Sequence, residues 1–481
     1  MSLKFVCLSD LHLGARDSLL SDKLDGSNIV AATFAQALRA TVKAMSKKPV
    51  RLVLLGDALD LGLSPMGEVS LNLINFLNLL FPSEGEGHKP AFERDIVYIP
   101  GNHDHHIWRM AQDERFIDRI EHSPRLDRDI LPITPIADKP TIACRLVTAL
   151  MQRVPALRGS ACHVAYPNWA IWDPKGKRAA VLHHGHFVDP MYMALSRLAQ
   201  WLELADDPRN AADIERRNGP WIDFIWSDLG SAGSVGQSAY TLYETMMDGD
   251  ASHEFAESLA HRVATMLASS IGIRENSPLP YNLTPEKLIR AAANYAVGST
   301  AQSQRDGYRN VLSRAMIGKL RWYLTNPVAR QFKKDCKKVP EEIAFIFGHT
   351  HKPFQDQIMV PPYQAPSRIY NTGGWVLDEP TQMPCQGAAA MLIDEKLNVA
   401  SLRLFNDVTN DEIAPVSAKG IGGFSDTDNP LLESAGKAID ANAAAWSSFS
   451  SEVRAAIIAL ADRRVQKRID EMQVEMAEAV A

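Results

Sequence analysis

Five short apolar runs in this chain share one arrangement, in which a run of core-type residues stops at a polar cluster. The runs are Leu3–Leu8, Val50–Leu55, Ile96–Ile99, Ala179–Leu182 and Ile343–Phe347. Each run is largely continuous rather than alternating, which is typical of a strand covered on both faces of its sheet. Because ligands collect at the carboxyl ends of strands in α/β sheets, we expect the five polar clusters to meet.

Helical periodicity separates the early strands. Val30–Met45 and Val69–Phe81 repeat apolar residues at helical spacing, as a βαβ arrangement requires. More strands are predicted further along the chain, and these are Trp169–Trp172, Arg178–Leu182, Arg368–Tyr370, Ala389–Ile393 and Val399–Phe405. The pattern therefore predicts an α/β protein in which the strands of the core are separated by a long interruption between Leu182 and Ile343.

The interruption itself has helical periodicity. Helix-period patterns occur at Tyr192–Leu204, Phe255–Ser269, Pro285–Val297 and Tyr308–Leu324. We predict a helical cap over residues 187–338, inserted between core parts at residues 1–186 and 339–410. Its two ends emerge close to polar clusters, so the cap is expected to select the substrate.

Residues 411–481 are predicted to be a Gly/Asp/Ser-rich linker followed by an amphipathic helix. The helix carries one apolar stripe, formed by Ile458, Ala461, Val465, Ile469, Met472 and Met476. This stripe is expected to pack on the core or on a sister subunit, so a homo-oligomer through the C-terminal helix is one expectation.

Composition and charge narrow the class of protein. At 481 residues the chain exceeds what one hydrophobic core usually serves. Its net charge of −6 argues against a generally basic surface, so nucleic acid is not the favoured partner. No apolar stretch resembles a signal peptide or approaches the roughly 20 residues of a membrane-spanning helix, so we expect a cytoplasmic protein. The five scattered cysteines suggest neither a disulfide framework nor a thiolate zinc site.

The polar clusters after the five runs contain the residue types that bind divalent metal ions. They are Asp10-x-His12, Gly56-Asp57-x-x-Asp60, Gly101-Asn102-His103-Asp104, His184-Gly185-His186 and Gly348-His349-x-His351. Carboxylate, amide and imidazole donors suit Mn, Fe, Zn or Mg, and no thiolate is offered. Two cations roughly 3.5–4 Å apart need a bridging carboxylate and several ligands each, and this set contains enough donors.

In order and content, these clusters resemble the calcineurin-like metallophosphoesterases. The resemblance covers about half of the chain and implies an α/β (α+β) sandwich core of mixed sheets that binds two divalent ions, with Mn favoured. It implies a first ion held by Asp10, His12, Asp57 and His351, with Asp57 bridging to a second ion held by Asn102, His184 and His349.

Roles for His103 and Asp104 follow from the same resemblance. His103 is expected to stabilise the transition state or to protonate the leaving oxygen, with Asp104 orienting its ring. A loop-capping carboxylate is the alternative for Asp104. Asp60 is expected to orient a ligand rather than to bind metal. His105 and His106 are expected to be exposed loop histidines.

The expected activity is dimetal-dependent hydrolysis of a phosphate ester or anhydride, in which a metal-bridging hydroxide attacks phosphorus. The sequence Gly348-His349-Thr350-His351-Lys352-Pro353 is similar to the last cluster of the UDP-2,3-diacylglucosamine pyrophosphatases, which implies a lipid-linked nucleotide sugar as one alternative substrate. The basic segment Arg330–Lys338 would suit a nuclease of the same superfamily if it lined the rim of the site. A metal-binding scaffold that recruits a partner is an alternative from another class.

Overall fold

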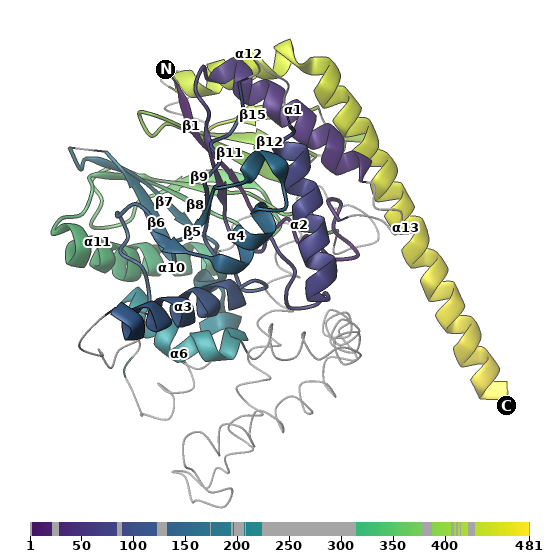
Figure 1. Ribbon diagram of the computed structural model, residues 1–481, viewed down its shortest axis with the longest axis horizontal. Coiled ribbons are helices and arrows are strands. Elements are labelled where there is room, and N and C mark those ends of the chain that lie inside the picture. Colours follow the sequence, from purple (N-terminus) through teal and green to yellow (C-terminus); the bar gives the residue numbers. More distant parts are fainter. Residues whose placement is uncertain are drawn as a thin grey trace, which may run out of the picture.

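Two mixed β-sheets lie face to face in the computed structural model of this chain, with helices outside them (Figure 1). The structure describes residues 2–21, 28–83, 89–122, 132–173, 175–193, 196, 206, 208–223, 314–377, 387–405, 408–409, 412–413, 415–421 and 429–480. Among the described residues, no helix is both long and apolar enough to span a bilayer.

The larger sheet has the first strand of the chain near its centre. β1 (Leu3–Leu8) runs parallel to β2 (Arg51–Leu54) and antiparallel to β11 (Ala389–Asp394), so a late strand pairs directly with the first. The spatial order is β15 (Ser417–Lys419), β12 (Val399–Arg403), β11, β1, β2, β3 (Ile96–Tyr98), β5 (Cys162–Val164) and β4 (Ile142–Ala143).

The smaller sheet also joins distant parts of the chain. Its order is β6 (Asn168–Trp172), β7 (Arg178–His183), β8 (Glu342–Phe347), β10 (Ser367–Asn371) and β9 (Phe354–Ile358). β7 and β8 are parallel neighbours, with Ala180 opposite Ala344. A short pair, β13 (Val408–Thr409) and β14 (Glu412–Ile413), stands apart. Each of the five predicted apolar runs forms a strand, which confirms that part of the prediction.

Helices cover the outer faces of the sandwich, and side chains such as Val53 and Ile346 fill the space between the sheets. One group on the side of the larger sheet comprises α1 (Ile29–Met45), α2 (Met66–Leu80), α4 (Arg145–Met151), α12 (Pro430–Ala441) and α13 (Ala443–Val480). Within the described residues, the remaining helices and single turns are η1 (Pro155–Leu157), α3 (His106–His122), η2 (His186–Val188), η3 (Pro190–Met193), α6 (Ala211–Asp223), α10 (Arg314–Tyr323), η6 (Leu324–Val328) and α11 (Ala329–Cys336).

Helix α1 illustrates how the sequence fixes such an element. Asn28 caps its start by accepting a hydrogen bond from the amide of Ala31 at 2.8 Å. The buried positions Phe34 and Leu38 recur at helical spacing and face the core. The helix ends before Lys47, Lys48 and Pro49, since proline disfavours helical geometry in the residue before it.

The predicted interruption is described only in part. Residues 224–313, which include the patterns at Phe255–Ser269 and Pro285–Val297, lie outside the described residues, so the cap and its boundaries stay predictions. At the end of the predicted interruption, α10 and α11 pack on the smaller sheet. Phe332 of α11 contacts Trp172 of β6, with 4.9 Å between ring centroids.

The C-terminal region differs from the prediction in two ways. The predicted linker contains β15, which extends the larger sheet by pairing Ala418 with Leu402. Helix α13 is anchored by its first turns, where Trp446 donates a hydrogen bond to the Thr41 hydroxyl at 3.0 Å. The predicted stripe does not pack on the core where it is described, because Ile458 is 53% exposed. Large aromatic side chains earlier in the helix provide the contacts instead.

Candidate metal centre

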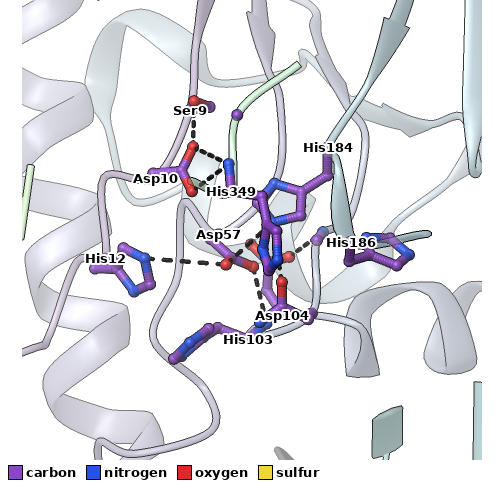
Figure 2. A network of polar contacts seen from close by, with 12 residues as sticks. Ser9, Asp10, His12, Asp57, His103, Asp104, His184, His186 and His349 are labelled. Atoms are coloured by element: carbon purple, nitrogen blue, oxygen red, sulfur yellow. Dashed lines mark hydrogen bonds and ion pairs between the residues drawn. The ribbon is translucent and has the colours of Figure 1, made fainter. Parts of the chain in front are cut away.

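The polar clusters that follow β1, β2, β3, β7 and β8 lie together at the carboxyl ends of their strands (Figure 2). Six of the seven predicted ligands fall into two groups whose donor atoms lie within 4.8 Å of one another, while His12, Asp57 and His103 form a further such group. The first group is Asp10, His12 and His351, and the second is Asp57, His184 and His349. Both groups therefore have the size and composition of a site for one divalent ion.

Close contacts between donor atoms test whether metal ions fit here. The Nε2 atoms of His12 and His351 lie 3.2 Å apart. Nε2 of His184 lies 3.1 Å from Oδ2 of Asp57 and 3.0 Å from Oδ1 of Asn102. Once the imidazoles are neutral, donor atoms that converge in this way can share a cation, and imidazole, carboxylate and amide oxygen fit Mn, Fe, Zn or Mg. The residues present thus fit a pair of ions.

The backbone of the centre adopts an uncommon conformation. Five candidate ligands have positive φ, and they are Asp10 (49°), His12 (45°), Asp57 (48°), His349 (73°) and His351 (53°). This left-handed conformation costs a non-glycine residue roughly 1–2 kcal/mol. Such residues cluster at functional sites, where the surrounding structure holds them in place. The chain therefore accepts local strain in order to turn these side chains towards one another.

Two glycines leave room for the ligands. A Cβ atom at Gly101 would overlap Oδ1 of Asp57, and one at Gly348 would overlap the Asp10 carboxylate. The amide of His349, next to Gly348, donates hydrogen bonds to Asp10 at 2.9 and 3.1 Å. Close approach of the backbone is therefore the reason for glycine at both positions.

Opposite charges compensate one another inside this buried cluster. Burial raises the pKa of Asp57, but the charges of His184 and His103 outweigh it and hold that pKa well below its usual range. Burial lowers the pKa of His184, but the charge of Asp57 and a hydrogen bond to it raise the pKa to about 9. The metal-free centre is thus a buried ion pair, and binding of a metal by His184 must release a proton.

A family profile described as calcineurin-like phosphoesterase matches residues 3–227. Over these residues the chain belongs to the calcineurin-like phosphoesterase family. Members of this family are phosphoesterases, and the buried His/Asp groups fit a dimetal site typical of it, so the protein is a metal-dependent phosphoesterase. A comparison with curated proteins found no match. The matched span ends before His349 and His351, which the second part of the core supplies.

In this phosphoesterase, the carboxylate against the His103 ring is that of Asp60, whose Oδ1 lies 2.8 Å from Nδ1. Asp104 was expected in that position, and this expectation needs correction. Its buried carboxylate instead accepts hydrogen bonds from four donors, which are the amides of Ala58, Leu59 and Gly101 and the hydroxyl of Tyr98. Asp104 therefore ties the turns after β2 and β3 together, as the loop-capping alternative predicts.

Replacing Asp104 by alanine should lower the free energy of unfolding by at least about 3 kcal/mol, because several buried donors would lose their acceptor. Urea unfolding of the metal-free protein measures this change. Asp113→Ala on the exposed face of α3 is the control and should change stability by less than about 0.5 kcal/mol. Equal stability of Asp104→Ala and Asp113→Ala would contradict the structural role.

His105 is fully buried, so the expectation of an exposed loop histidine is wrong for this residue. Its Nδ1 lies 2.6 Å from Oδ1 of Asp223, and its Nε2 lies 3.3 Å from Oε1 of Glu215. Burial lowers the pKa of His105, but the two carboxylates outweigh it and raise the pKa to about 10. Both partners are on α6, over a hundred residues later in the chain, so no local sequence signal points to them. His106 is half-buried at the start of α3.

The raised pKa of His105 predicts a pH-dependent stability. Protonated His105 is stabilised in the folded state, so its contribution is complete below about pH 6.5 and is lost as the pH rises through about 10. The difference in free energy of unfolding between the wild type and His105→Gln should therefore shrink between pH 7 and pH 10. Urea titrations at several pH values measure this difference, and a constant difference would contradict the ion-pair assignment.

Proposed function

We propose that this phosphoesterase hydrolyses a phosphate ester or anhydride with two divalent metal ions that share Asp57 as a bridging ligand. The observation that carries the proposal is the position of Oδ2 of Asp57 between the two groups. This atom lies 3.1 Å from Nε2 of His184 in the second group and 3.9 Å from Nε2 of His12 in the first. Asp10, His12 and His351 would complete one site, and Asn102, His184 and His349 the other.

When bound, two such ions supply positive charge for the phosphoryl oxygens and lower the pKa of the attacking water. The protein positions this chemistry through its own hydrogen bonds. The His103 amide donates to Oδ1 of Asp57 at 2.8 Å, and the His349 amide donates to Asp10. These bonds fix the direction of both carboxylates before substrate arrives.

His103 is the proposed proton donor to the leaving oxygen. Asp60 engages Nδ1 of its ring, so transfer to substrate would use Nε2. Burial lowers the pKa of His103, but the charge of Asp57 and the hydrogen bond to Asp60 raise it overall. The contact with Asp60 thus stabilises the protonated ring, which is the form that a general acid requires.

Substrate choice and metal identity are finer parts of the proposal. We favour Mn²⁺ and assign substrate selection to residues 187–338, with a lipid-linked nucleotide sugar as one candidate. The nuclease alternative gains no support from the basic segment, because Lys338 donates a hydrogen bond to the carbonyl of Lys175 before the start of β7. That end of the strand is opposite to the one that carries His184.

The test is hydrolysis of three probes by chelated protein with and without added Mn²⁺. The probes are bis-p-nitrophenyl phosphate, p-nitrophenyl phosphate and a nucleotide diphosphate conjugate. We expect turnover only after Mn²⁺ is restored, and the preferred probe identifies diester, monoester or anhydride chemistry. Equal rates with and without Mn²⁺ would reject the metal-dependent mechanism.

A further inference from the structure

We propose that Glu215 and Asp223 of α6 are positioning residues of the metal centre, which act through His105 on the turn that carries Asn102 and His103. The inference rests on the proposed function, because it concerns the second metal site and the proposed proton donor. It makes α6 part of the machinery that shapes the centre.

The contact between α6 and His105 is buried and has several partners. The side chain of Glu215 is 5% exposed and that of Asp223 is 17% exposed. Asp223 reaches two groups at the start of α3, since Oδ1 lies 2.6 Å from Nδ1 of His105 and Oδ2 lies 3.2 Å from Nε of Arg109. Two carboxylates therefore face two basic groups, of which the His105 ring is fully buried and the Arg109 side chain is 47% exposed.

His105 connects this cluster to the metal ligands through the backbone. It follows the Gly101–Asp104 turn, and its carbonyl accepts a hydrogen bond from the amide of Trp108 at 2.8 Å in the first turn of α3. Asn102 lies three residues before His105 and has its Oδ1 3.0 Å from Nε2 of His184. A fixed His105 ring therefore restricts the end of the turn that presents Asn102.

A second chain of hydrogen bonds leads from Glu215 to the segment after β7. The hydroxyl of Tyr166 donates a hydrogen bond to Oε2 of Glu215 at 2.9 Å and lies 3.2 Å from Nε2 of His186. On the same helix, Asn218 donates a hydrogen bond to the Ser196 hydroxyl at 2.7 Å, just beyond η3. Helix α6 thus contacts His105 directly, and it reaches His186, two residues after His184, through Tyr166. None of its carboxylates belongs to the groups that could hold a metal within the described residues.

The experiment measures Mn²⁺ binding to chelated full-length protein by calorimetry. The variants are Asp223→Asn and Glu215→Gln, which keep side-chain size and remove charge. The matched control is Asp394→Asn, a fully buried carboxylate that accepts hydrogen bonds from the amides of Lys396 and Asn398. Asp394 pairs with Leu3 at the end of β1 away from Asp10, so its loss should leave metal affinity unchanged.

We expect each α6 variant to weaken one of the two Mn²⁺ sites by about tenfold or more and to leave the other unchanged, as is typical when a partner of the ligand shell is lost. The kcat should fall while KM stays within about twofold, and the melting temperature should change no more than in Asp394→Asn. If Glu215→Gln does not fold, Asp223→Asn decides, since its side chain is less buried.

Unchanged Mn²⁺ binding and kcat in both variants, or parallel weakening of both sites in step with the melting temperature, would overturn the inference. Failure of the proposed function has a different signature, in which the wild type binds two Mn²⁺ ions but hydrolyses no probe. Calorimetry of the variants still tests the positioning role in that case.

Discussion

Replacing Asp57 by alanine is expected to remove tight binding of both metal ions and to lower kcat/KM by at least about 1,000-fold. The reason is the position of the carboxylate, which lies within 3.9 Å of a histidine nitrogen in each of the two groups. Loss of the Asp57 carboxylate removes one negative charge and one metal ligand from both sites. Metal content after desalting and Mn²⁺-dependent hydrolysis measure the two effects.

The control for this prediction is Asp335→Ala on α11, which also removes a carboxylate that accepts a backbone hydrogen bond, here from Ile136 at 2.9 Å. It should keep two bound ions and wild-type turnover. Asp57→Asn keeps the size of the side chain and should lose activity as well, because charge rather than volume is decisive. Activity retained by Asp57→Ala would show that the bridging assignment is wrong.

Replacing His103 by glutamine should lower kcat by about 100-fold or more while both ions stay bound, because the variant loses a proton donor but no ligand. Asp60→Asn should reduce kcat in the same direction, since Asp60 holds the ring through Nδ1 at 2.8 Å. The measurement combines kcat with Mn²⁺ stoichiometry for each variant.

His106→Gln is the matched control, because His106 lies three residues further along the chain, outside the cluster. It should keep kcat within about twofold of the wild type. Loss of one bound ion in His103→Gln would be the contrary result. His103 would then act as a ligand, which the structure permits geometrically, since His12, Asp57 and His103 also form a group with donor atoms within 4.8 Å.

The strands and the polar clusters that follow them in the sequence could be predicted because both depend on local sequence. Where a continuous apolar run stops just before Asp10 or Asp57, the sequence itself shows where the strand ends. Parallel strands place their carboxyl ends at the same edge of the sheet, so the polar residues that follow them meet there. The chemistry of the cluster then follows from residue type alone. The number of sheets and their strand order could not be obtained in this way, since β1 pairs with a strand that begins at Ala389.

The errors concern contacts between distant residues. By sequence, Asp104 and Asp60 could each be the partner of His103. Only the fold shows that the Asp104 carboxylate accepts hydrogen bonds from backbone amides instead. His105 looks like a loop residue until α6 brings Asp223 to it. Strand β15 is too short and polar for its pattern to be recognised, and it forms because β12 offers an edge.

The interleaving of early and late strands also has a consequence for how this chain folds. During synthesis, β1 can pair at first only with β2, and β7 only with β6. Their second partners, β11 for β1 and β8 for β7, are made more than 150 residues after β7. Such non-local pairing raises the contact order, which slows folding and leaves strand edges exposed. A fragment ending at residue 227 would contain the whole span matched by the family profile, but it would lack His349 and His351 and keep an open edge on each sheet. Aggregation is therefore the expected fate of such a fragment.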